Sequence, residues 1–379
     1  MQPTGPLDLF LAAPPGLESA LLAEARALEL DGCAAVAGGV RATGDWGEVW
    51  RANLHLRGAG RVLVRFAEFR AVHLAQLDKR ARRLAWSSVL RADVAVRVEA
   101  TSKRSRIYHA GAAAERIARA IREELGAPAQ SGAKAGAGEE AVRVLVRLED
   151  DLCTISLDTS GEPLHRRGHK LAVAKAPLRE TLAALLLRQL GYDGRESVLD
   201  PMCGSGTLVL EAAEIALGLA PGRTRAFAFE RLAGFEAATW QAMRSAHETA
   251  PAPPHCYGFD RDAGAIEASR ANAARAGVEG YAQFARQSIT DLMPPEGARP
   301  GLIVVNPPYG ARIGDKGRLR ALYASFGRVV AERFSGWRVG LVTSEGDLAR
   351  ACGLPFAPPG PPVPHGSLRI RLYRTAVLP

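Results

Sequence analysis

Apolar runs typical of buried strands alternate with helical stretches in the C-terminal half of this chain. We expect strands at 197–200, 255–260, 283–286, 302–305 and 339–343, and helices at 178–190, 208–219, 262–276 and 318–334. Such alternation predicts an α/β fold with a doubly wound parallel sheet. The loops that follow the strands then share one edge of the sheet, which is where such sheets bind ligands.

A glycine loop follows the first of these strands. Residues 201–207 read Pro-Met-Cys-Gly-Ser-Gly-Thr and lead directly into a helix. Gly204 and Gly206 let the backbone approach a ligand at the helix N-terminus, where unpaired N–H groups favour an anion. A dinucleotide site would continue as G-x-G-x-x-G, but Val209 occupies the third position and Asp200 precedes the loop. The pattern favours S-adenosylmethionine, with Asp200 receiving its ammonium and the loop amides its carboxylate.

The next strand ends in Asp260, which is placed to accept both hydroxyls of a ribose. The gap between the glycine loop and Asp260 far exceeds the roughly twenty residues of a minimal unit. We therefore expect an insertion at about 220–254. Each acidic residue alone has a structural explanation, Asp200 as a loop cap and Asp260 as the N-cap of the helix at 262–276. The order of the motifs favours a ligand site.

The motif Asn306-Pro307-Pro308-Tyr309 directly follows the apolar run at 302–305. An exocyclic amine on a nucleobase is a poor nucleophile because its lone pair is delocalised into the ring. The Asn306 side-chain oxygen and a carbonyl in the rigid Pro307 turn are two acceptors that would localise this pair. Tyr309 would stack on a base that has left its helical stack. The motif predicts methylation of a base amine.

Composition excludes several classes of protein. We find no run of 18 or more apolar residues and no N-terminal signal, so we expect a cytoplasmic protein without a membrane span. Five dispersed cysteines, with no C-x-x-C pair, argue against a metal site and against a disulfide framework. Cys203 lies inside the glycine loop, and we expect it to pack there rather than to act as a nucleophile.

Positive charge is concentrated in one segment. The net charge is +9, and residues 79–106 hold nine Lys or Arg against two Asp or Glu. Such a stripe predicts salt-sensitive binding to phosphates, although runs of charge often form only a solvated helix face. The expected partner is RNA, bound by a monomer.

The first 165 residues are expected to form small α+β units. Helices are predicted at 16–30, 74–89 and 112–125, and strands at 9–12, 36–43, 61–66, 93–100, 142–148 and 152–157, the last two as a hairpin. The Gly/Ala/Ser-rich segment 126–140 is expected to be a loop. A boundary falls at 164–170 (Leu-His-Arg-Arg-Gly-His-Lys).

With these motifs in hand, the chain resembles a THUMP-domain class I RNA methyltransferase, of the branch similar to bacterial 23S rRNA guanine-N2 methyltransferases. Four segments carry the likeness in the family's order: 164–168, 176–184, 200–207 and 306–310. The resemblance implies a ferredoxin-like unit at 1–60, a THUMP RNA-binding domain at 61–165 and one Rossmann-like methyltransferase domain at 171–379. Ser288 stands where an Asp usually meets the adenine, and His169-Lys170 replaces the usual Tyr-Arg.

The predicted site is as follows. The catalytic residues are Asn306, Pro307, Pro308 and Tyr309. The residues of the S-adenosylmethionine site are Pro177, Asp200, Cys203, Gly204, Gly206, Thr207, Asp260, Arg261, Ser288 and Asn306. The RNA contacts are Lys79, Arg80, Arg82, Arg83, Lys103, Arg104, Arg106, Arg166 and Arg167.

Three alternatives to the 23S rRNA guanine-N2 activity stay open at this point. The same architecture would serve a tRNA guanine-N2 methyltransferase. The Asn-Pro-Pro-Tyr motif would equally serve an adenine-N6 methyltransferase. A catalytically idle RNA-binding assembly factor belongs to a different class, and it would show no affinity for S-adenosylmethionine.

Overall fold

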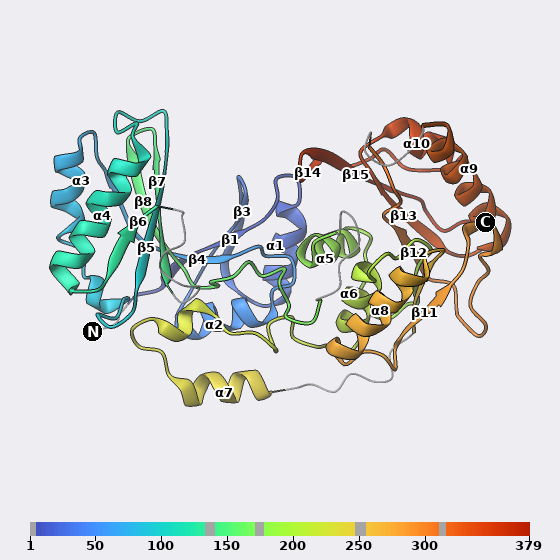
Figure 1. Ribbon diagram of the computed structural model, residues 1–379, viewed down its shortest axis with the longest axis horizontal. Coiled ribbons are helices and arrows are strands. Elements are labelled where there is room, and N and C mark those ends of the chain that lie inside the picture. The colour runs from blue at the N-terminus through green and yellow to red at the C-terminus, as the bar shows by residue number, and fades with distance from the viewer. Residues whose placement is uncertain (1–4, 133–140, 171–177, 247–254, 311–315) are drawn as a thin grey trace. The chain divides into compact units, whose positions relative to one another are not determined.

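The computed structural model describes residues 5–132, 141–170, 178–246, 255–310 and 316–379. The chain forms two compact units. The first comprises Met1–Ala13, Leu22–Leu164 and Arg225–Ala246, and the second comprises Pro14–Leu21, His165–Thr224 and His247–Pro379. Each unit is built on one sheet (Figure 1).

The sheet of the first unit has eight strands in the order β2-β3-β1-β4-β8-β7-β5-β6. The strands are β1 (Leu7–Ala12), β2 (Asp31–Val36), β3 (Gly39–Gly44), β4 (Val62–Arg70), β5 (Val96–Lys103), β6 (Ala129–Ser131), β7 (Val142–Glu149) and β8 (Leu152–Asp158). β5 pairs in parallel with β6 and β7, and the other pairs are antiparallel. The predicted division at residue 60 stays a prediction, since strands on both sides of it share this sheet.

The two faces of this sheet differ in character. The helices of this part of the chain are α1 (Glu18–Ala27), α2 (Trp46–His55), α3 (Leu74–Ala81), α4 (Ala110–Leu125) and α7 (Ala237–Ser245). In β7, Val144, Val146 and Leu148 are buried. Residues alternate between faces along a strand, so Arg143 and Arg147 lie on the other side. Aromatic contacts place the α3 region on the apolar side, because Phe66 of β4 packs 5.3 Å from the Trp86 ring.

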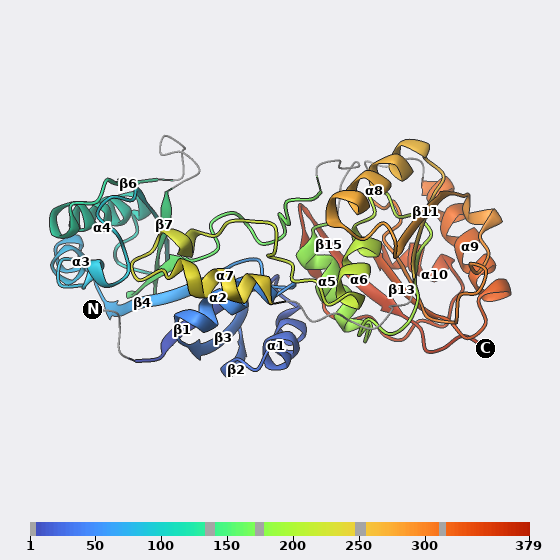
Figure 2. The same ribbon diagram turned by 90° about the horizontal axis from the view of Figure 1, so that it is seen from below.

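The second unit confirms the predicted doubly wound α/β sheet (Figure 2). Its order is β11-β10-β9-β12-β13-β15-β14, with β15 antiparallel to both of its neighbours. The strands are β9 (Val198–Asp200), β10 (Cys256–Asp260), β11 (Ala282–Arg286), β12 (Leu302–Val305), β13 (Arg338–Thr343), β14 (Val363–His365) and β15 (Leu368–Arg374). The helices are α5 (Glu180–Gln189), α6 (Thr207–Ala216), α8 (Ala263–Ala276), α9 (Lys316–Arg333) and α10 (Gly346–Ala351).

Several predicted elements in the first unit need correction. The strand expected at 36–43 is a hairpin of β2 and β3, and the helix expected at 74–89 ends at Ala81. Helix α2 was not predicted, although its signal is present: Asp45 caps it by accepting the N–H of Glu48 at 3.0 Å, in the spacing of a capping box. Part of the loop expected at 126–140 forms β6, which pairs with β5.

The predicted insertion belongs largely to the first unit. Residues 225–246 cluster there, and Phe229 stacks at 5.9 Å from Trp50 and meets Trp240 edge-on at 4.9 Å. Aromatic burial of this kind stabilises a core. Across the described ranges, no helix has the length and apolar character needed to cross a membrane.

Candidate active site

In the sheet of the second unit, the order in which the chain adds strands reverses at β9. The chain passes from β9 to β10 and β11 on one side, then returns to place β12 on the other side. The register pairs Gly258 with Asp200 and Ile303 with Leu199, all in parallel strands. The carboxyl ends of β9, β10 and β12 therefore share one edge, at the switch point where such sheets bind ligands.

Both sequence motifs line one cavity at this edge. It has a volume of about 70 Å³. Its lining residues are Leu178, Asp200, Met202, Cys203, Gly204, Ser205, Thr207, Leu208 and Asn306. The glycine loop and the start of the Asn-Pro-Pro-Tyr motif, about a hundred residues apart in sequence, thus face the same space.

Asp200 is a buried carboxyl in this cavity. It is 2% exposed, and it accepts the N–H of Met202 at 3.0 Å. Burial raises the pKa of Asp200 to about 8; the charge of Asp260 acts in the same direction, and the Met202 N–H opposes both. A cation beside Asp200 would favour its ionised form. The site is therefore suited to an ammonium group.

The glycine loop is fixed by bonds inside the protein. The two oxygens of Asp260 accept the N–H groups of Gly204 and Asp262, each at 3.0 Å. The Gly206 N–H donates to the Cys203 carbonyl at 2.8 Å. The two glycine N–H groups are thus committed to acceptors within the protein, whereas the N–H groups in the first turn of α6 have no intrahelical acceptor and can meet an anion. Both glycines have positive φ, +55° and +84°, which explains the residue type.

Asp260 is not the N-cap of the following helix. The cap of α8 is Asp262, whose side chain accepts the N–H of Gly264 at 2.8 Å and that of Ala265 at 3.3 Å. Asp260 lies at the end of β10 and is only partly buried. It therefore joins β10 to the glycine loop, and its contact with a ribose stays a prediction.

Lys170, which departs from the family pattern, contacts two residues of the cavity wall. Its ammonium donates to the Thr207 hydroxyl at 2.7 Å and to the Leu178 carbonyl at 3.0 Å, and it pairs with Glu180 at 3.2 Å. Thr207 and Leu178 both line the cavity. Lys170 therefore links the start of α5 to the start of α6 at the wall of the cavity.

Asn306 carries a buried acceptor without a partner. Its Oδ1 is inaccessible to water, and no hydrogen-bond donor reaches it among the described residues. Such an atom costs roughly 1–3 kcal/mol unless a ligand satisfies it. The neighbouring Pro308 carbonyl accepts the Tyr323 hydroxyl at 3.3 Å. Tyr309 is 8% exposed, and burial raises its pKa to about 12; its stacking on a base stays a prediction.

A second unpartnered acceptor lies beyond the end of β11. Gln287 donates from its side chain to the Asp291 carbonyl at 3.0 Å, while its Oε1 is buried without a partner in the described part of the chain. The Ser288 hydroxyl donates to Asp291 at 2.8 Å. A single glutamine outside any recognisable motif carries no local signal of a binding role.

The Cys203 thiol is 7% exposed, and burial raises its pKa. A buried thiol of raised pKa is a poor nucleophile. Among the described residues, no group of three or more His, Cys, Asp and Glu side chains is placed to hold a metal ion. Pro177 lies outside the described residues. Arg261 is exposed, and its carbonyl accepts from Arg286 at 3.0 Å.

The predicted RNA contacts are spread over different surroundings. Arg167 is 2% exposed and donates to Glu211 at 3.3 Å, so its geometry does not fit direct contact with RNA. Arg82 pairs with Asp78, Glu123 and Glu124, and Arg104 pairs with Glu149 and Asp150. Lys79, Arg80 and Arg83 are exposed on or just after α3, and Lys103 ends β5.

The fold and this edge define a class I S-adenosylmethionine-dependent methyltransferase domain. Comparison with known families narrows the class: residues 167–355 match the family described as "RMKL-like, methyltransferase domain", and residues 8–63 match the "RlmL ferredoxin-like domain". The chain belongs to the RlmL-like methyltransferases, with a ferredoxin-like N-terminal domain. Its cofactor is S-adenosylmethionine.

The chain is similar to "Ribosomal RNA large subunit methyltransferase K/L" of Syntrophotalea carbinolica, with 36% identity over 361 residues, 92% of this chain and 51% of that protein. It spans about half the length of the curated relatives it matches. Among solved structures it is similar to SMU.472, a putative methyltransferase complexed with SAH (25% identity, TM-score 0.85, 100% of both chains). It is also similar to TrmN from Thermus thermophilus (25% identity, TM-score 0.73, 98% of this chain and 100% of that one).

Proposed function

We propose that this protein transfers a methyl group from S-adenosylmethionine to the exocyclic N2 of a guanosine in 23S rRNA. The observation that carries the proposal is the Asn306 Oδ1, which is buried without a partner in the described part of the chain, on the wall of the cavity that the glycine loop also lines. The names of the curated relatives, which are ribosomal RNA large subunit methyltransferases, support the choice of RNA.

The cofactor is held by groups along one sheet edge. Asp200 binds the ammonium of its methionine end, and the first-turn N–H groups of α6 bind its carboxylate. Asp260 accepts from the ribose hydroxyls. The Gln287 Oε1, at the end of the next strand, accepts from the adenine amine where family members use the Asp that Ser288 replaces here. When bound, the cofactor supplies an electrophilic methyl group.

Asn306 prepares the target amine. Its Oδ1 accepts one N–H of the base amine and the Pro307 carbonyl accepts the other, which localises the nitrogen lone pair. Catalysis is then mostly positioning and orientation. A strong base is not required, because the proton leaves after the nitrogen has become positively charged. The base must leave its stack to reach this wall, which is easiest for an unpaired nucleotide.

Mass spectrometry of rRNA and tRNA nucleosides from a deletion strain tests the proposal. We expect one N2-methylguanosine to disappear from 23S rRNA, and the purified protein to restore it with S-adenosylmethionine. Loss of N6-methyladenosine instead would assign the clamp to adenine. Loss from the tRNA fraction alone would assign the enzyme to tRNA. No change in either fraction would overturn the proposal.

A further inference from the structure

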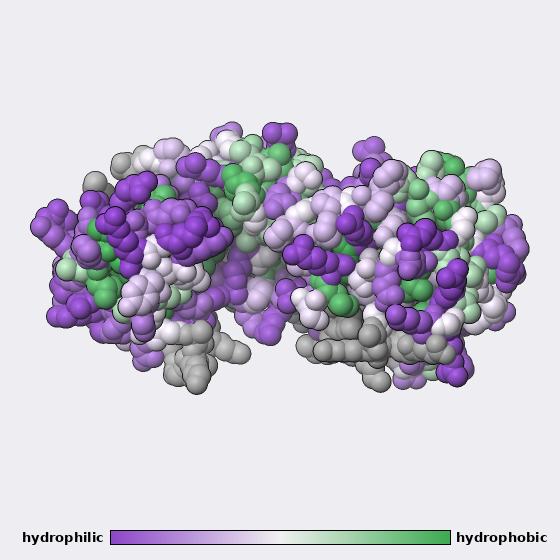
Figure 3. All heavy atoms as spheres, turned by 90° about the horizontal axis from the view of Figure 1, so that it is seen from above, coloured by the Kyte–Doolittle hydropathy of each residue, from purple (hydrophilic) through white to green (hydrophobic). Residues whose placement is uncertain are grey.

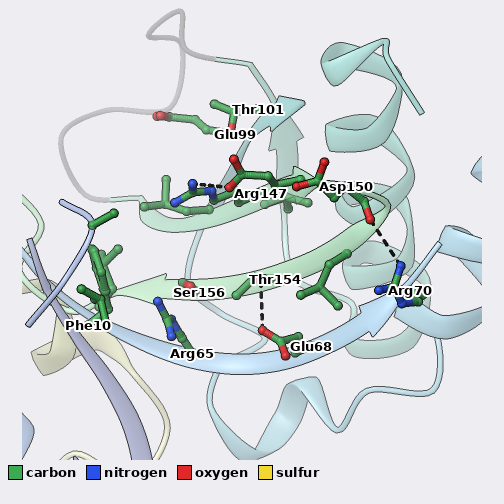
Figure 4. A pocket seen from close by; sticks show the side chains of 17 residues that line it. Phe10, Arg65, Glu68, Arg70, Glu99, Thr101, Arg147, Asp150, Thr154 and Ser156 are labelled. Atoms are coloured by element: carbon green, nitrogen blue, oxygen red, sulfur yellow. Dashed lines mark hydrogen bonds and ion pairs between the residues drawn. The ribbon is translucent and has the colours of Figure 1, made fainter. Parts of the chain in front are cut away.

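One face of the eight-stranded sheet carries none of the helices of the described first unit. We call it the open sheet face. A groove of about 630 Å³ runs across it, and all its lining residues come from strands or the turns between them (Figure 4). Arg65, Glu68 and Arg70 of β4 line it, whereas Phe66 and Phe69 point to the helices, where Arg80 lies 5.7 Å over the Phe69 ring.

Most of the cations on the open sheet face are arginines. Strand alternation and register place seven cations and six carboxylates on it, an excess of one positive charge. The cations are Arg41, Arg65, Arg70, Arg97, Lys103, Arg143 and Arg147, and the carboxylates are Asp8, Asp31, Glu68, Glu99, Glu149 and Asp158. The cations reach further into solvent than their partners: the Arg41, Lys103 and Arg147 side chains are 54%, 68% and 62% exposed, against 28% for Asp8 and 25% for Glu149. A surface that presents its positive groups outward favours a polyanionic partner.

The carboxylates hold the arginines in place rather than cancel them. Asp8 is shared by Arg41 at 2.9 Å and Arg65 at 3.7 Å. Glu99 is shared by Arg97 at 3.2 Å and Arg143 at 2.7 Å. Arg143 also contacts Asp158 at 3.3 Å, and Asp158 pairs with Arg61, so three guanidinium groups share two carboxylates there. In both clusters the carboxylates orient the guanidinium groups and one positive charge remains. A guanidinium fixed in this way is preorganised for phosphate, which it binds through its planar fork.

The floor of the groove suits nucleosides as well as phosphates. Half-buried Leu63, Leu145 and Leu152 lie beside the hydroxyls of Thr154 and Ser156. The Arg65 guanidinium stacks 5.0 Å from the Phe10 ring, which makes it a flat platform of the kind on which bases stack. Figure 3 shows hydrophilic residues gathered over the first unit.

We propose that the open sheet face, rather than helix α3, is the surface on which the first unit holds RNA. The partner is an RNA segment with unpaired bases, its phosphates on the shared arginines and its bases on the groove floor. This inference rests on the proposed function and adds to it the surface that contacts the RNA. Helix α3 lies on the opposite, apolar side of the sheet, and its Arg82 is already bound to three carboxylates.

Two double variants of equal charge test the assignment in the full chain. Arg70→Gln with Arg147→Gln removes two exposed cations from the open sheet face, and Lys79→Gln with Arg83→Gln removes two exposed cations from the α3 side. The probe is transcribed, protein-free 23S rRNA, with the dissociation constant measured from 50 to 200 mM salt. Melting temperature and S-adenosylmethionine affinity, measured for all proteins, show whether each variant is folded.

We expect the sheet-face variant to lose about tenfold or more in RNA affinity and to reduce the salt slope by about two, and the α3 variant to change less than threefold. Equal losses, or a larger loss for the α3 variant, would overturn the inference and leave the proposed function standing. Loss of binding to ribosomal particles with unchanged affinity for naked rRNA would assign the face to a ribosomal protein and also overturn it. Failure of the proposed function shows separately, as unchanged methylated nucleosides in the deletion strain.

Discussion

The cavity at β9 and the open sheet face handle polar groups in opposite ways. Among the described residues, Asp200 in the cavity is buried without a basic partner and Asn306 keeps an unsatisfied acceptor. On the open sheet face, Asp8, Glu99 and Glu149 each contact two or more cations.

The difference indicates how each region binds. A buried unpaired group is costly, so its ligand must satisfy it with fixed geometry and is bound specifically. Exposed shared ion pairs are individually weak, so they suit an extended partner held by many salt-sensitive contacts. These properties support our proposals that the first region binds one small molecule and the second binds a polymer.

The largest effect is expected at Asn306. Asn306→Ala removes the acceptor that holds the base amine, and the methylation rate should fall about 10²–10³-fold, as when other single transition-state hydrogen bonds are removed. S-Adenosylmethionine affinity should stay within about twofold. Stopped methylation together with an equal loss of cofactor affinity would show that Asn306 serves the cofactor instead.

Asp260→Ala should raise the S-adenosylmethionine dissociation constant about 10–100-fold, because a charged acceptor for two hydroxyls is lost. Asp262→Ala is the matched control: it removes the α8 cap and should lower the free energy of unfolding by about 1 kcal/mol without weakening cofactor binding. Calorimetric titration measures the dissociation constant of each variant. If Asp262→Ala weakens cofactor binding as much as Asp260→Ala does, Asp260 supports the shape of the glycine loop and does not contact the ribose.

Cofactor affinity should depend on pH through Asp200. Because the free carboxyl has a pKa of about 8, cofactor affinity should fall about tenfold for each pH unit below 8, and Asp200→Asn should remove this slope.

The stability of the free protein should change in the opposite direction, falling as the pH rises. A folded pKa raised above the unfolded value of 3.8 means that the folded protein binds more protons, so the free protein loses stability as pH rises from about 4 to 8. A flat binding profile between pH 6 and 8 would show that no cation meets Asp200.

Lys170→Met should raise the cofactor dissociation constant several-fold, since Thr207 and Leu178 lose their shared anchor. Lys170→Arg should restore most of the affinity, because it keeps the charge beside Glu180. If Lys170→Met and Lys170→Arg both lower the melting temperature and weaken cofactor binding to the same extent, Lys170 has only a structural role.

The smallest effect sharpens the comparison itself. Raising salt from 50 to 200 mM should change the S-adenosylmethionine dissociation constant by less than about twofold, because buried charges are poorly screened. RNA affinity should fall steeply over the same range. A cofactor constant that follows the RNA trend would mean that the cavity is more open than its burial indicates.

Much of the second unit could be predicted from the sequence. The strands that end at Asp200, Asp260 and Val305 were placed nearly to the residue, because apolar runs and glycine or proline turns are local signals. The site motifs were recognisable for the same reason. Helix α2 was missed although its capping signal was present, and Gln287 was missed because one acceptor has no local pattern.

The sequence by itself determined the order of strands and helices, the glycine loop and the acceptor at Asn306, because each depends on residues adjacent in the chain. Only the tertiary structure decided that residues 225–246 join the first core and that Lys170 anchors Thr207. It also decided which side of the eight-stranded sheet is free of the described helices. Arginines at alternate strand positions become a surface only when strands far apart in sequence pair, and that pairing depends on long-range burial that no short segment encodes.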